Sequence, residues 1–162
     1  MYDWDYNSGG EVHMKASDTI AAVLANKSPE VFSIAPTETV YRAVEMMAGR
    51  RVGALLVMAG DRLLGIISER DYARKVILLD RSSRQSKVQD IMTAPVTTVS
   101  PDSTVDECMR IMTEKRIRHL PVVQNERVVG MVTIGDLVKW MITLHEETIE
   151  QLHAYISGNY PG

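Results

Sequence analysis

The segments GIISERD, residues 65–71, and GMVTIGD, residues 130–136, share one pattern: Gly, two apolar residues, Ser or Thr, two further residues and Asp. In both, an apolar run leads to the hydroxyl residue, which predicts a strand that continues directly into a helix. The spacing of Thr133 and Asp136 fits a capping box, in which each side chain accepts a hydrogen bond from the other residue's amide. One such segment indicates only where a helix begins. Two of them point to a duplicated structural unit.

The similarity extends well beyond these segments. When the sequence is shifted by 65 residues, positions 31–72 align with positions 96–137 without a gap. Internal repetition of this length predicts two structural units of the same fold. The identical pairs are Val31 and Val96, Pro36 and Pro101, Thr39 and Thr104, Val40 and Val105, Met47 and Met112, Arg51 and Arg116, Leu55 and Leu120, Val57 and Val122, Arg62 and Arg127, Gly65 and Gly130, and Asp71 and Asp136.

Each unit is predicted to fold in the order β-α-β-β-α. An extended piece that ends in Pro, at 31–36 or 96–101, precedes a helix whose N-cap we place at Thr37 or at Asp102 or Ser103. Two strands joined by a tight turn follow, at 54–58 and 63–67 or at 120–123 and 128–132, and a second helix completes the unit. A unit of about 60 residues has a marginal core alone. We therefore expect an α+β fold in which the two repeats pack about an approximate two-fold axis, with a cleft between their sheets.

Composition suggests the boundaries. We expect an N-terminal arm or artificial segment at 1–14, a first repeat at 15–80, a polar linker at 81–87 and a second repeat at 88–145. The arm carries Tyr2, Trp4 and Tyr6, which we expect to rest on another surface, such as a partner subunit. In the last segment, 146–162, apolar residues keep helical spacing as far as Ile156. This predicts a final helix of about 20 residues that ends near Gly158 and is long enough to reach another subunit.

Composition also argues against several classes of function. The net charge of −3 gives no general attraction for nucleic acid or for an anionic membrane. No apolar run approaches the ~20 residues of a membrane span. No signal peptide opens the chain, so we expect a cytoplasmic protein. The one cysteine, Cys108, lies in an apolar helical stripe and is expected to be a buried structural thiol.

The usual catalytic and metal-binding patterns are absent from the sequence. The segment that begins at His145 has no second His at position 149, so it fails the helical zinc-protease pattern. There is no glycine-rich phosphate loop, nucleophile elbow or paired base and nucleophile. We therefore expect no catalytic residues, no metal site and a protein that is not an enzyme.

The order of elements and three motifs resemble the cystathionine-β-synthase (CBS) domain family. The motifs are the two Gly-to-Asp segments and the segment Ile117-Arg-His-Leu-Pro121, an apolar stretch that ends in Pro. The resemblance covers about residues 15–145 and implies a stand-alone CBS pair, also called a Bateman module. The first repeat departs from the third motif, because residues 52–56 lack the proline and the basic pair. We therefore expect two sites of unequal affinity.

By this resemblance, the clefts bind an adenine ribonucleotide, with AMP first and ATP or NAD(H) next. Asp136 or Asp71 would accept hydrogen bonds from the ribose hydroxyls. Thr133 or Ser68, together with the helix N-terminus, would bind phosphate. The glycines of the two motifs would leave room for the ligand.

The resemblance also implies a set of contact residues. Arg118 and His119 are either phosphate partners or part of a solvated basic loop, and Arg70 either reaches a phosphate or pairs with Glu69 or another neighbour. The loops 52–54 and 117–121 would hold the base, the first at the Asp136 site and the second at the Asp71 site. The expected nucleotide-binding residues are Val31, Val52, Gly53, Ala54, Ile66, Ser68, Arg70, Asp71, Val96, Ile117, Arg118, His119, Pro121, Met131, Thr133 and Asp136.

Three functions are compatible with these residues. The first is a regulatory module that senses energy or redox state through an adenine nucleotide and signals by a change of shape to an unknown effector protein. The second is a structural dimerisation module whose nucleotide clefts are vestigial. An unrecognised enzyme is the third, and it would have to turn over the bound nucleotide. We expect a homodimer formed through the apolar helix positions Val44, Met47, Met109 and Met112.

Overall fold

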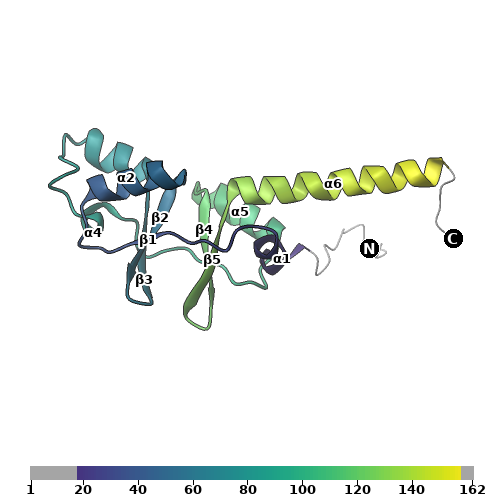
Figure 1. Ribbon diagram of the computed structural model, residues 1–162, viewed down its shortest axis with the longest axis horizontal. Coiled ribbons are helices and arrows are strands. Elements are labelled where there is room, and N and C mark those ends of the chain that lie inside the picture. Colours follow the sequence, from purple (N-terminus) through teal and green to yellow (C-terminus); the bar gives the residue numbers. More distant parts are fainter. Residues whose placement is uncertain (1–17, 158–162) are drawn as a thin grey trace.

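The computed structural model describes residues 18–157. The expectations for the aromatic arm at 1–14 and for the helix stop at Gly158 lie outside the described residues. Two globular halves lie side by side, each with a β-hairpin below its helices, and one helix projects from the second half (Figure 1). None of the helices within 18–157 is long and apolar enough to cross a membrane.

The first repeat forms a small mixed sheet covered by helices. Strand β1 pairs with β2 in parallel, and β2 pairs with β3 in the antiparallel sense. The predicted strands at 54–58 and 63–67 lie inside β2 and β3 and are confirmed. The elements are β1 (Ser33–Ile34), α2 (Val40–Arg50), β2 (Ala54–Ala59), β3 (Arg62–Ser68), α3 (Glu69–Tyr72) and the π-helix η2 (Ala73–Ile77).

The second repeat follows the same order with a reduced first strand. Val99 makes a single parallel bridge to Val122, which is equivalent to the pairing of Ile34 with Val57 in the first repeat. The final helix runs for 23 residues, so the predicted long C-terminal helix and the α+β repeat fold are confirmed. The elements are α5 (Val105–Lys115), β4 (His119–Gln124), β5 (Arg127–Thr133) and α6 (Ile134–Ile156).

Helices α2 and α5 begin later than predicted. Their N-caps are Thr39 and Thr104, whose hydroxyls accept hydrogen bonds from the amides of Arg42 and Glu107 at 3.2 and 3.1 Å. The predicted caps at Thr37 and at 102–103 are wrong, because those residues form a turn before the helix. The cap that satisfies the first turn is therefore the hydroxyl next to the first apolar residue.

Each repeat is completed by a short helix from the other half of the chain. Helix α1 (Ile20–Ala25) packs into the core of the second repeat through Ile20 and Val23. Helix α4 (Val88–Ile91) packs into the core of the first repeat through its own two apolar ends. The linker at 81–87 is part of this exchange, because the carbonyls of Ser83 and Ser86 accept hydrogen bonds from the first amides of α2.

The two motif glycines make room for these crossing segments. A Cβ at Gly65 would lie 2.6 Å from Met92 Sδ, and a Cβ at Gly130 would lie 2.8 Å from Leu24 Cδ2. Met92 follows α4 directly, and Leu24 is part of α1. The expectation that these glycines leave room for a ligand is therefore wrong, because protein side chains fill the space.

Two further expectations concern buried residues. Cys108 is fully buried, and burial, assisted by the nearby charge of Glu107, raises the pKa of its thiol to about 11. It is the structural thiol that its apolar stripe predicted. Met47 and Met112 also lie inside the two cores. Because they are buried, they cannot form the predicted dimer surface. Helical spacing alone does not distinguish a helix face that packs on the core from one that packs on a partner.

Candidate functional site

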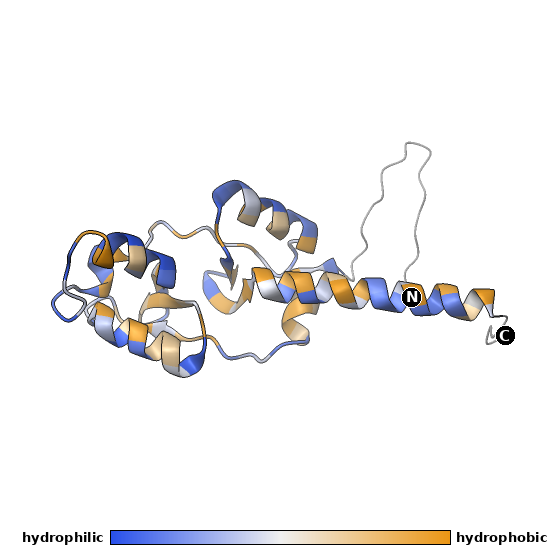
Figure 2. Cartoon of the chain, turned by 90° about the horizontal axis from the view of Figure 1, so that it is seen from above, coloured by the Kyte–Doolittle hydropathy of each residue, from blue (hydrophilic) through white to orange (hydrophobic). Residues whose placement is uncertain are grey.

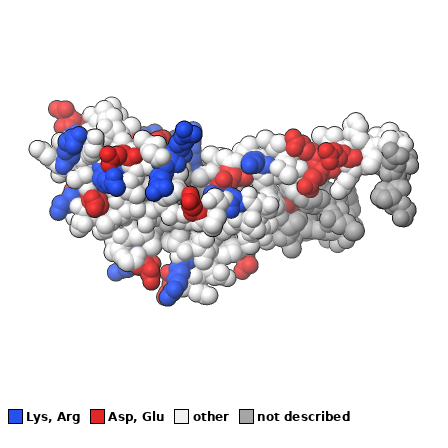
Figure 3. All heavy atoms as spheres, viewed as in Figure 1, with Lys and Arg blue, Asp and Glu red and all other residues white. Residues whose placement is uncertain are grey.

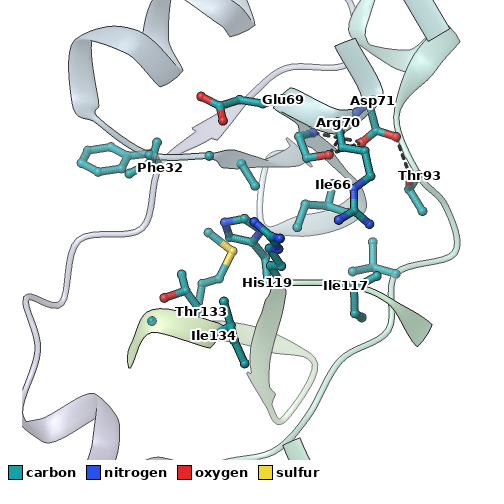
Figure 4. Close-up of a pocket in the computed structure, with 18 of the residues that line it drawn as sticks. Phe32, Ile66, Glu69, Arg70, Asp71, Thr93, Ile117, His119, Thr133 and Ile134 are labelled. Atoms are coloured by element: carbon teal, nitrogen blue, oxygen red, sulfur yellow. Dashed lines mark hydrogen bonds between the residues drawn. The ribbon is translucent and has the colours of Figure 1, made fainter. Parts of the chain in front are cut away.

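A cavity of about 570 Å³ lies between the two repeats and is lined by both. Figure 4 shows part of the lining, with Ile66, His119 and Thr133 among the labelled residues. Thirteen of the sixteen residues expected at the site line this one cavity. These are Val52, Gly53, Ala54, Ile66, Ser68, Arg70, Asp71, Val96, Ile117, Arg118, His119, Met131 and Thr133. Sequence reasoning missed other lining residues, which are Lys27, Glu30, Phe32, Arg51, Glu69, Thr93, Pro95, Thr97, Ile134 and Gly135.

Three expected residues do not line the cavity. Pro121 is buried within β4, where its carbonyl accepts a hydrogen bond from the amide of Val99. Val31 is half-buried, and its neighbours in the sequence, Glu30 and Phe32, do line the cavity. The Asp136 carboxylate is 2.6 Å from the ammonium of Lys27, a residue that does line the cavity.

The first helix start joins β3 to α3 through a capping box. The Ser68 amide donates to Asp71 Oδ2 at 3.0 Å, and the Asp71 amide donates to Ser68 Oγ at 3.2 Å. The other carboxylate oxygen, Oδ1, accepts from the Thr93 hydroxyl at 3.1 Å and is 2.9 Å from the Lys75 ammonium. Both oxygens of this buried carboxylate are therefore occupied by protein groups (Figure 4).

The second helix start joins β5 to α6 in the same way but leaves one oxygen open. The Thr133 amide donates to Asp136 Oδ2 at 2.9 Å, and the Asp136 amide donates to Thr133 Oγ1 at 3.2 Å. The Lys27 ammonium also reaches Oδ2, at 2.6 Å, and donates to the Met131 carbonyl at 2.8 Å. Within residues 18–157, no hydrogen bond reaches Asp136 Oδ1. This carboxylate therefore keeps an acceptor that Asp71 has lost.

His119 occupies the middle of the cavity (Figure 4). Its ring lies so close to Gly53 that a Cβ there would be 3.4 Å from His119 Cε1. Burial lowers the pKa of His119, the positive charge of Arg118 lowers it further, and only Asp136 opposes the shift. The imidazole is therefore neutral at neutral pH and can donate or accept a hydrogen bond.

The expected basic residues have different surroundings. Arg70 donates to the carbonyl of Arg116 at 2.5 Å, so it joins α3 of the first repeat to the end of α5 in the second. Arg118 lines the cavity beside His119. Arg70 was expected either to reach a phosphate or to pair with a neighbouring residue. In this structure it pairs with a neighbour, the Arg116 carbonyl.

Each apolar loop is attached to the helix start of its own repeat. The Glu69 amide donates to the Gly53 carbonyl at 3.1 Å, and the Ile134 amide donates to the Arg118 carbonyl at 2.9 Å. The expected crossed pairing of loops and carboxylates is therefore not made by hydrogen bonds. The repeats meet instead across the shared cavity, where Gly53 faces His119.

The lining combines three kinds of chemistry. Apolar side chains such as Phe32, Ile66 and Ile117 offer flat contact, and neighbouring cations offer partners for an anion. The start of α6 adds the positive end of a long helix dipole. The arrangement suits a ligand that has a planar apolar part, hydroxyl groups and a negative charge.

Comparison with known proteins gives three findings. The CBS domain family model matches residues 20–78 and 88–143. The Arabidopsis thaliana protein named CBS domain-containing protein CBSX3, mitochondrial, is 47% identical over 128 residues, which are 76% of this chain and 62% of that protein. This chain thus spans less than two thirds of that relative's length.

Solved structures share the fold. A protein with CBS domains from Burkholderia ambifaria MC40-6 is 46% identical with a TM-score of 0.76, over 77% of this chain and 94% of that chain. The CBS domain pair of protein MJ0100, solved with 5′-methylthioadenosine and S-adenosyl-L-methionine, has a TM-score of 0.67 over 76% of this chain and 94% of that chain. At 24% identity, this second likeness shows the fold alone.

Proposed function

Because this chain belongs to the CBS domain family, whose model matches both of its repeats, we propose that it is a regulatory module that binds an adenine ribonucleotide between those repeats. AMP is the first candidate ligand, and ATP or NAD(H) comes next. The proposal includes a homodimer and an effector protein that responds to the ligand-dependent change of shape. The cytoplasmic location stays a prediction, and the name of one relative places that protein in mitochondria.

The observation that carries the proposal is that two capped helix starts meet at one cavity of suitable size and lining. A volume of about 570 Å³ falls within the roughly 300–1,000 Å³ of small-molecule sites. Phe32, Ile66 and Ile117 supply apolar surface for a base, and Lys27 and Arg118 supply charge for a phosphate. In protein MJ0100 the same fold holds two adenosine derivatives, which supports the choice of ligand class.

Asp136 is the better candidate for the ribose. Its Oδ1 has no protein donor among the described residues, whereas both oxygens of Asp71 are occupied. It stands at the start of the 23-residue helix α6, whose dipole favours an anion nearby, whereas α3 has four residues. Because a ribose diol uses both carboxylate oxygens, Lys27 would have to release Oδ2 of Asp136, and the released ammonium would then pair with the phosphate of the ligand.

Calorimetric titration of AMP into the wild type and two variants tests this assignment. Asp136→Asn keeps one acceptor for the cap but loses the charge that strengthens hydrogen bonds to a diol, a loss of about 1.5–3 kcal/mol or ten- to hundred-fold in affinity. The second variant, Asp71→Asn/Asp136→Asn, removes both carboxylates. If it binds AMP as tightly as the wild type does, the ribose role is wrong and the motif is only a cap.

One observation favours the alternative of a structural module with vestigial clefts. The first-repeat carboxylate is fully used inside the protein, by Ser68, Thr93 and Lys75. A thermal shift measurement with AMP, ATP and NADH distinguishes the two functions. A ligand that binds the folded state at a hundred times its dissociation constant raises stability by about 2.7 kcal/mol. No change with any of the three at millimolar concentration would favour the structural alternative.

A further inference from the structure

Helix α6 carries an apolar surface that the rest of the described chain leaves uncovered. Its first turns pack on the second repeat through Leu137 and Trp140. Beyond them the helix projects from the globular part, with hydrophobic residues spaced among hydrophilic ones along its length (Figures 1 and 2). Val138 is 42% exposed, Ile142, Ile149 and Leu152 are each more than half exposed, and Ile156 is 82% exposed.

These exposed residues follow a heptad. Steps of four and three residues alternate along one side of α6, and we call this set of six positions the α6 seam. Isoleucine occupies all three positions of one type, a, while Val, His and Leu occupy the other type, d. The a positions are Ile142, Ile149 and Ile156, and the d positions are Val138, His145 and Leu152.

A projecting helix with this seam needs a partner. Most helical stability in proteins comes from packing an apolar face rather than from intrinsic propensity. The seam is about 27 Å long at 1.5 Å per residue. It lies to the side of the stripe that contacts the second repeat, since Leu137 and Trp140 are turned toward the core while Val138 and Ile142 are exposed. The seam is therefore separate from the contacts that hold α6 on the second repeat.

We propose that the α6 seam is the homodimer interface and that two copies pair in parallel as a short coiled coil. Isoleucine at a with Leu at d favours two parallel strands. Acidic side chains gather on the projecting part of α6 (Figure 3), where the sequence has Glu146, Glu147 and Glu150. In the parallel order Glu146 lies beside Met141 of the second copy. In the antiparallel order it lies beside the second Glu146, which is unfavourable.

The size of the seam also favours the parallel orientation of the two helices. A strip about 27 Å long and 10–12 Å wide gives roughly 300 Å² per copy, or about 600 Å² in all. Stable interfaces bury ~1,200 Å² or more, so the seam alone is too small. The globular part lies entirely at the first end of α6 (Figure 1). A parallel pair brings both globular parts to the same end, where they add contact, and an antiparallel pair separates them.

Light scattering on the full chain tests the surface. We expect a dimer of the wild type at micromolar concentration, a monomer of Ile149→Glu, and an unchanged dimer of Gln151→Glu, which adds the same charge off the seam. Both sites lie outside the two cores, so the globular part should stay folded in both variants. A dimeric Ile149→Glu, or a monomeric wild type, would overturn the proposal and leave residues 1–17 or another protein to cover the seam.

Disulfide formation tests the order. In the parallel pair, residue 142 of one copy faces residue 142 of the other. Ile142→Cys should therefore cross-link under mild oxidation, while Thr143→Cys, one residue off the seam, should not. The native Cys108 is buried and does not compete. In the antiparallel pair, position 142 faces position 152, about 15 Å along the helix from the other 142, beyond the reach of a disulfide. Cross-linking that appears only in Ile142→Cys/Leu152→Cys would overturn the parallel order.

Discussion

Replacing Lys27 with Met is expected to weaken the requirement for a phosphate on the ligand. Lys27 holds Asp136, the carboxylate proposed to bind the ribose. A neutral nucleoside that takes Asp136 leaves the Lys27 ammonium without its partner. A nucleotide supplies a phosphate to which the ammonium can turn. The wild type should therefore discriminate between AMP and adenosine, and Lys27→Met should discriminate less.

The magnitude follows from the geometry of the pair. The Lys27 ammonium is 2.6 Å from Asp136 Oδ2, and the two side chains are 27% and 24% exposed. Exposed ion pairs contribute about 0–1 kcal/mol, and hydrogen bonds between charged groups contribute about 1.5–3 kcal/mol. We therefore assign ~1–2 kcal/mol of stabilisation to this partly buried pair. Adenosine should bind Lys27→Met about five- to thirty-fold more tightly than it binds the wild type. The affinity for AMP should stay level or fall.

Calorimetric titration of both ligands into three proteins measures the effect. Lys139→Met is the matched control, because Lys139 is exposed on α6 and does not line the cavity. An affinity for adenosine that stays the same in Lys27→Met, while AMP binds the wild type, would refute the role of Lys27 and leave the nucleotide site intact. Failure of AMP to bind any of the proteins would instead count against the proposed function itself.

Two further predictions concern stability. Gly65→Ala should lower the free energy of unfolding by about 1–3 kcal/mol in urea titrations, since the new Cβ would meet Met92 Sδ at 2.6 Å. Gly49→Ala, in an open part of helix α2, should raise it by about 0.5–1 kcal/mol, and equal effects of the two would contradict this account. Because burial lowers the pKa of folded His119, the unfolded chain protonates first as the pH falls below ~6.5. The free energy of unfolding should therefore decline toward pH 5, and that of His119→Gln should decline less steeply.

The hairpins and the helices after them could be predicted because their signals are local. Apolar runs mark the strands, Gly60 and Asn125 mark the turns with positive φ, and the hydroxyl and Asp of each motif mark the helix starts. Most expected site residues reach one cavity for the same reason, since they flank these elements in both repeats. Their role in binding stays a prediction, because shared lining shows position and not affinity.

The packing of α1 on the second repeat and of α4 on the first could not be predicted. Both helices are short, and their equivalent residues do not follow the 65-residue offset of the repeat. The two helices have six and four residues, too few for an apolar period to appear. Thr19 bridges to Thr104 and Lys87 bridges to Thr39, so the equivalent residues are 68 positions apart. An alignment at 65 does not match them. Lys27 was missed for the same reason, since its contact with Asp136 depends on which repeat α1 packs against.

The crossing segments also explain why each motif needs both its first and its last residue. Leu24 fills the space above Gly130, and Lys27, three residues later, holds Asp136 at the other end of the motif. In the first repeat Met92 fills the space above Gly65, and Thr93 bonds the aspartate of that motif. Each motif therefore clamps the segment that connects the two halves of the protein. A ligand that displaces Lys27 from Asp136 releases one end of this clamp, and so acts directly on the loop that joins α1 to the first repeat.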